Sequence, residues 1–85
     1  MIVRLFASVR KAYGDKTVEV EASELTLAVL MDRLAQRIEG IADSVSRGAV
    51  LMAVNRELVD PIGKDRDRMV HSGDEIALMP PLAGG

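Results

Sequence analysis

The sequence has 85 residues, 11 of them basic and 13 acidic, for a net charge of −2. This length fits one small domain, and the absence of cysteine excludes disulfides, a thiolate metal site and a cysteine nucleophile. The basic residues form no stripe interleaved with aromatic side chains, so we expect no nucleic-acid binding. We also expect a cytoplasmic protein without membrane association, because no apolar run approaches membrane-spanning length and residues 1–5 lack the features of a signal peptide.

A hairpin is predicted at the start of the chain. Residues 2–9 are mostly apolar, which is typical of a buried strand. Residues 17–21 alternate between polar and apolar, so Val18 and Val20 should face the core of a half-exposed strand. Because the turn-forming pair Gly14-Asp15 lies between the two segments, they should pair as antiparallel strands.

One main helix is predicted after the hairpin. Apolar residues recur at helical spacing from Leu27 to Ile38 and form a single stripe. Thr26 is expected to cap the N-terminus of this helix, with Ser23 as the alternative, and Gly40 is expected to end it. The residues that fall off the stripe should face solvent; they are Asp32, Arg33, Gln36 and Arg37.

The second half of the chain predicts mostly strands. In order we expect a polar connector with a short helical turn (41–48), a buried strand (50–54), a turn (55–57), a short strand (58–59), a loop (61–63), a second turn (72–74) and a last strand (75–79). This order indicates an α+β fold of the β-grasp type, with a mixed sheet of about five strands and one main helix packed on one face. The first and last strands should be central neighbours. We therefore expect a β-grasp domain at residues 1–79 and a flexible C-terminal tail at residues 80–85.

No catalytic constellation is apparent in the sequence. His71 is the only histidine, and no serine is marked as a nucleophile beside it, so we expect it on the surface. Asp74 and Glu75 are adjacent, and adjacent residues of a strand point to opposite faces, so they should not form an acid–base pair. Metal-ligand spacing and a glycine-rich phosphate loop are both missing. We expect no active site of its own, no bound cofactor and no metal in this chain.

The C-terminal residues have features suited to chemistry in a partner's active site. Pro80-Pro81 should form a stiff, extended stalk. Leu82-Ala83 and then Gly84-Gly85 follow, and a glycine thread without side chains can enter a narrow channel. The α-carboxylate of Gly85 has no β-carbon beside it to obstruct attack, but it becomes an acyl donor only after activation, for example as an acyl adenylate made from ATP by an external enzyme.

Four segments resemble a known family. Residues 3–10 resemble its first strand, 52–57 its third strand and asparagine-containing turn, 72–76 its turn into the last strand, and 80–85 its Pro-Pro and Gly-Gly terminus. On these residues the chain is similar to the small, sulfur-carrying subunit of molybdopterin synthase, within the ubiquitin-like sulfur carriers. Leu78-Met79 stands where that family often has aromatic residues.

The resemblance implies a mechanism for the tail. A ubiquitin-activating-type enzyme would use ATP to adenylate Gly85, and a sulfur donor would convert it to a thiocarboxylate. The tail would then enter the large subunit of a heterotetrameric synthase and give its sulfur to the pterin precursor, which forms the dithiolene that holds molybdenum or tungsten. The resemblance implies that Gly84 and Gly85 are the transfer residues. Residues that thread into the partner would be Pro80, Pro81, Leu82 and Ala83, and the partner-binding surface would be Phe6, Leu78 and Met79.

Two alternatives share some of these features. A related ubiquitin-like carrier or modifier would use the same tail for thiazole synthesis, transfer-RNA thiolation or attachment to protein lysines. A β-grasp binding module without carrier chemistry would have an incidental Gly-Gly end. Deletion of the tail separates this second alternative from the carriers, because a passive module would keep its function.

Overall fold

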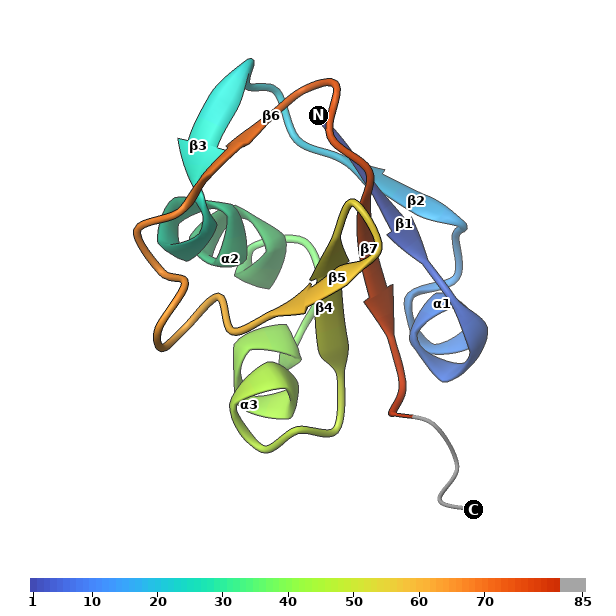
Figure 1. Cartoon of the computed structure of the whole chain (residues 1–85). Helices are drawn as coiled ribbons and strands as arrows, with labels where there is room; N and C mark the ends of the chain where they lie inside the picture. Colours follow the sequence, from blue (N-terminus) through green and yellow to red (C-terminus); the bar gives the residue numbers. More distant parts are fainter. Residues whose placement is uncertain (82–85) are drawn as a thin grey trace.

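The computed structural model describes residues 1–81, in which a five-stranded mixed sheet has the strand order β2-β1-β7-β4-β5 (Figure 1). β1 (Ile2–Leu5) pairs antiparallel with β2 (Thr17–Glu19) and parallel with β7 (Ile76–Met79). β4 (Leu51–Val54) pairs antiparallel with both β7 and β5 (Glu57–Val59). The predicted antiparallel pairing of the first two strands and the predicted neighbourhood of the first and last strands are confirmed, although a helix and not a simple turn joins the first two strands. β7 is the central strand of the sheet.

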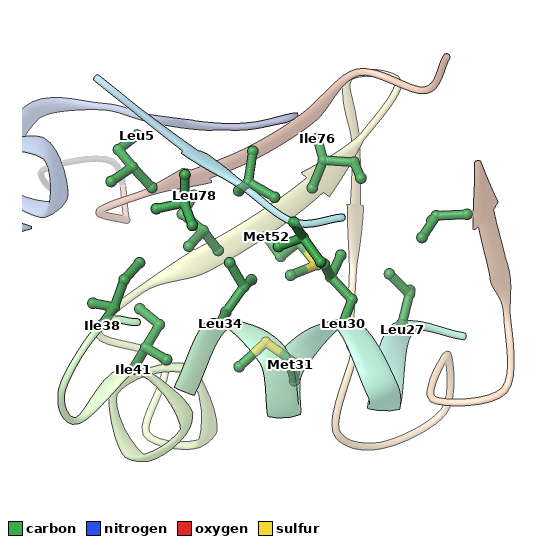
Figure 2. Packing of buried hydrophobic residues seen from close by; sticks show 14 of the residues in the cluster. Leu5, Leu27, Leu30, Met31, Leu34, Ile38, Ile41, Met52, Ile76 and Leu78 are labelled. Atoms are coloured by element: carbon green, nitrogen blue, oxygen red, sulfur yellow. The ribbon is translucent and has the colours of Figure 1, made fainter. Parts of the chain in front are cut away.

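The longest helix, α2 (Leu27–Ala35), covers one face of this sheet. Its leucines Leu27, Leu30 and Leu34 are fully buried, and Figure 2 shows Leu30 and Leu34 pointing toward Met52 and Leu78 of the sheet. Each buried leucine side chain stabilises the fold by about 1.5–3 kcal/mol relative to an exposed one. The apolar stripe predicted from the sequence is therefore the face of α2 that packs into the core.

The ends of α2 confirm one prediction and correct another. Thr26 is the N-cap, and its hydroxyl accepts a hydrogen bond from the Val29 N–H at 3.3 Å. The helix ends at Ala35 rather than near Gly40. Gly40 instead adopts a left-handed conformation with φ 76° directly before α3 (Ile41–Ser46), so this glycine redirects the chain between two helices.

The predicted strand over residues 2–9 is wrong beyond Leu5. Phe6 is still extended, but the chain then forms α1 (Ala7–Tyr13), in which Val9 is buried. A short apolar run does not distinguish a strand from a helix by its periodicity alone. Gly14, expected in a hairpin turn, is the left-handed C-cap of α1 with φ 94°.

A second, two-stranded sheet was absent from the sequence-based prediction. β3 (Glu24–Thr26) pairs antiparallel with β6 (Met69–His71). Three-residue strands contain too few positions to show a period of two, and Thr26 gave a helix-cap signal instead. Val70 is fully buried, so this small sheet closes the core beside the start of α2. Within residues 1–81, no helix combines the length and the apolar character needed to cross a membrane.

Candidate functional site

The chain leaves the sheet from its central strand. β7 ends at Met79 and runs into Pro80-Pro81 at the end of the sheet, between α1 and α3 (Figure 1). The last pairings hold this end firmly: Met79 lies opposite Leu51, and the Phe6 N–H donates to the Leu78 carbonyl at 3.0 Å. The predicted transfer and threading residues Leu82, Ala83, Gly84 and Gly85 lie outside the described residues.

Phe6 and Met79 lie together beside this exit. Leu5 is paired with Leu78, and both of these side chains are buried against the helices. Because side chains alternate between the faces of a sheet, the next residues, Phe6 and Met79, point to the opposite, outer face. Phe6 is 45% exposed and Met79 is half-buried, so both predicted partner-binding side chains remain accessible.

The structure corrects the prediction for Leu78, the third predicted partner-binding residue. Leu78 is fully buried, and in Figure 2 its side chain lies in the cluster that faces α2. The prediction that this side chain contacts a partner is wrong, because its position on β7 places it on the core face. The sequence pair Leu78-Met79 therefore divides between the core and the surface.

Sequence reasoning missed further apolar residues on the outer face. Ala77 of β7 pairs with Ala53 of β4, and Ala53 pairs with Leu58 of β5. Leu58 is 60% exposed, while the two alanines are nearly covered by their neighbours. Together these residues form an apolar surface, called the outer-face patch below, that consists of Phe6, Leu51, Ala53, Leu58, Ala77 and Met79. The sequence could have indicated that Leu58 faces outward, because it is the strand neighbour of Val59, whose side chain packs against the core.

At the far end of the sheet, Asn55 and Asp74 join two turns. The Asn55 side-chain amide donates to Asp74 at 3.2 Å and accepts from the Glu75 N–H at 2.9 Å. The His71 N–H donates to the other Asp74 oxygen at 2.7 Å. This backbone hydrogen bond from His71, followed by the Asn55 bond, lowers the pKa of Asp74 below its usual 3.8. The two sequence motifs at these turns therefore act together to hold the ends of β4 and β7.

The charged side chains at this end serve the structure. Glu75 faces Arg56 at 3.5 Å while Asp74 accepts the hydrogen bonds above, so the two carboxylates act separately. His71 is exposed, 3.4 Å from Glu24 and 3.6 Å from Asp74. Among residues 1–81 there is no cluster of three or more histidines and carboxylates that could hold a metal ion. The candidate functional site is the exit of the tail with the outer-face patch, where the accessible side chains of Phe6, Met79 and Leu58 lie.

Comparison with known proteins decides the family. The model of the ThiS family matches residues 3–85. The chain belongs to the ThiS family. The molybdopterin synthase sulfur carrier subunit of Escherichia coli (strain K12) is 35% identical, over 98% of this chain and 96% of its own length. The resemblance noted in the sequence is therefore confirmed.

Solved structures support the same fold. SAMP1 from Haloferax volcanii superposes with a TM-score of 0.68 at 24% identity, covering 99% of this chain and 97% of that chain. A complex of subunits 1 and 2 of the molybdopterin-converting factor from Helicobacter pylori 26695 contains a chain that matches with a TM-score of 0.59 at 25% identity, covering 99% of this ThiS-family chain and 96% of its own. The predicted β-grasp fold is confirmed.

Proposed function

We propose that this chain is the sulfur carrier subunit of a molybdopterin synthase and that it carries sulfur as a thiocarboxylate on Gly85. The observation that supports this most directly is the family match, which extends through Gly85. Relatives that align over nearly the whole chain are themselves sulfur carrier subunits of molybdopterin synthase. The fold contributes a rigid central strand that ends directly before the Pro-Pro segment.

The proposed chemistry begins with activation of a carboxylate that is ionised at neutral pH. One oxygen of the Gly85 carboxylate attacks the α-phosphate of ATP, the bond to pyrophosphate breaks, and an acyl adenylate forms. Sulfide then attacks the acyl carbon, AMP leaves with the electron pair of the broken C–O bond, and a thiocarboxylate remains on Gly85. A ubiquitin-activating-type enzyme supplies the ATP site, so the carrier itself binds no cofactor.

The proposed acceptor complex is a heterotetramer with the large synthase subunit. The Helicobacter pylori complex contains two subunits of the molybdopterin-converting factor, which supports such a pairing here. The outer-face patch offers exposed apolar side chains, among them Phe6 and Leu58, on the face of the sheet next to the exit of the tail, and exposed apolar surface gathered on one face is typical of an interaction site. Docking there directs residues 82–85 into the large subunit, where the sulfur of the thiocarboxylate bonds to a carbon of the pterin precursor. Water then cleaves the acyl C–S bond, which leaves the sulfur on the pterin and restores the Gly85 carboxylate.

Intact-protein mass spectrometry tests this function. The chain is incubated with ATP, a sulfide source and the activating enzyme of the same cell. We expect the mass to rise by the exchange of one oxygen for one sulfur, with the change mapped to Gly85. An unchanged mass would contradict the carrier function, and an amine adduct at Gly85 would assign the chain to protein conjugation instead.

The acceptor is tested separately. Thiocarboxylated chain is mixed with the large subunit and the pterin precursor, and formation of the dithiolene is followed. Transfer to a thiazole precursor or to transfer RNA, with none to the pterin, would keep the carrier role but replace the proposed acceptor.

A further inference from the structure

We propose that a basic cleft beside α1 receives acidic side chains of the large subunit at the rim of the outer-face patch. This inference rests on the proposed function, because it concerns the same partner. The basic cleft is lined by Ala7, Arg10, Lys11, Gly14, Asp15 and Lys16.

The backbone holds the basic side chains of the cleft close to one another. Arg10 and Lys11 lie in the last turn of α1, and Gly14 ends the helix by donating its N–H to the Arg10 carbonyl at 2.9 Å. The chain then returns along β1, where the Leu5 N–H donates to the Lys16 carbonyl at 2.8 Å. This hydrogen bond fixes the backbone of Lys16, which lines the same cleft as Arg10 and Lys11, and its side chain is exposed like theirs.

Charge is distributed unevenly between this region and the rest of the molecule. Residues 1–18 contain Arg4, Arg10, Lys11 and Lys16 against Asp15 alone, a formal charge of +3. The whole chain carries −2, so the remaining residues carry −5. The N-terminal segment therefore presents a positive surface on an otherwise acidic protein, and such a surface attracts negatively charged partners.

Within the described part of the chain, the cations of the basic cleft also form no ion pairs. Within residues 1–81, ion pairs involve four arginines of the second half of the chain, namely Arg47, Arg56, Arg66 and Arg68. No carboxylate of the described residues forms an ion pair with Arg10, Lys11 or Lys16. The ion pairs of the fold thus involve arginines outside the basic cleft, and the three cations of the cleft remain available to a partner.

The basic cleft is continuous with the outer-face patch. A neighbouring cleft is lined by Arg4, Leu5, Phe6, Arg10, Lys16 and Thr17. Phe6 therefore shares one surface depression with cations of the basic cleft. Interfaces combine an apolar centre with a polar rim, so carboxylates are the chemistry that fits the partner's rim here. Nucleic acid fits less well, because single-stranded nucleic acid is bound by several aromatic side chains on which successive bases stack, and here, among the described residues, Phe6 is the one exposed aromatic side chain beside the cleft.

We expect these cations to affect the association rate more than the stability of the final complex. Charges at the rim of an interface act mainly on the rate of encounter and on its salt dependence. The test is stopped-flow association of the full chain with the large subunit of the same organism. The test variant is Lys11→Glu/Lys16→Glu. The matched control is Arg33→Glu/Lys64→Glu, which makes the same charge change at exposed positions outside the cleft.

We expect the association rate constant of the test variant to fall about tenfold at low ionic strength. The control should stay close to the unsubstituted chain. The difference should vanish near 1 M salt, where the screening length is about 3 Å. Equal thermal melting of both variants shows that the fold is kept.

Each other outcome has a distinct meaning. Equal rates for test and control variants at every salt concentration overturn the role of the basic cleft while the proposed function stands. Failure of the unsubstituted chain to bind the large subunit overturns the proposed function and, with it, this inference. Binding of total transfer RNA that is lost in the test variant, with an unchanged association rate, overturns the inference and assigns the cleft to nucleic acid.

Discussion

The two ends of the sheet use their polar and apolar groups in opposite ways. At the end with the turns, Asn55, Asp74 and the backbone of His71 and Glu75 bond to one another. At the end where the tail leaves, Phe6 is exposed and Lys11 and Lys16 have no ion-pair partner among the described residues. The difference shows that one end is built for the stability of the fold, whereas the other keeps its groups available for a partner.

The largest expected effect is at the tail, where function should be lost without any loss of stability. Deletion of Gly85, or Gly84→Val, should abolish sulfur transfer in an assay with the large subunit. Thermal melting should match that of the unsubstituted chain, because the core is formed by residues up to Leu78. Normal transfer by the deletion variant would contradict the carrier function.

Two neighbouring residues of β7 should differ strongly in their contribution to stability. Leu78→Ala should lower the free energy of unfolding by about 2–5 kcal/mol, because a fully buried leucine leaves a cavity. Met79→Ala should cost much less in the same urea titration, because its side chain is only half-buried. Similar losses for both variants would mean that the two faces of β7 are not distinct.

A charge in the outer-face patch should weaken binding of the large subunit. Met79→Asp, Phe6→Asp or Leu58→Asp should each raise the dissociation constant about tenfold or more, because a carboxylate would lose its water in an apolar contact. Titration calorimetry measures this change. Val29→Asp is the control, since Val29 is exposed on α2 and lies outside the patch; an equal effect there would place the interface on another face.

The smallest expected effect is at the turns. The pKa of Asp74 is lowered in the folded chain, mainly by the His71 N–H and then by Asn55. Its stabilising contribution is therefore present above the usual pKa of 3.8 and is lost as the pH falls below that value toward the folded pKa.

Thermal melting as a function of pH tests this contribution. Asp74→Asn should show a weaker fall in melting temperature below about pH 4 than the unsubstituted chain. Asp32→Asn, on the solvent side of α2, is the control and should keep the original pH dependence. Identical profiles for Asp74→Asn and the unsubstituted chain would mean that the turn network does not depend on this carboxylate.

Much of the fold was predictable because local signals agreed with one another. The stripe from Leu27 to Leu34 and the cap at Thr26 predicted α2, and the alternation around Val18 predicted the face of β2. Elements with fewer residues were not recovered. α1 and the β3–β6 pair are too short for a period to be counted, and they form because Val9 and Val70 find space in the core.

By itself, the sequence determined the family, the β-grasp order of elements and the tail with its two glycines, because these depend on local residue types and their spacing. Only the tertiary structure decided which side chains can meet a partner. Strand register places Leu78 in the core, and Met79 and Leu58 on the outer face. The return of the chain after Gly14 brings Lys16 beside Arg10. These neighbourhoods depend on hydrogen bonds between residues that are distant in sequence. Local sequence patterns contain no information about such pairings.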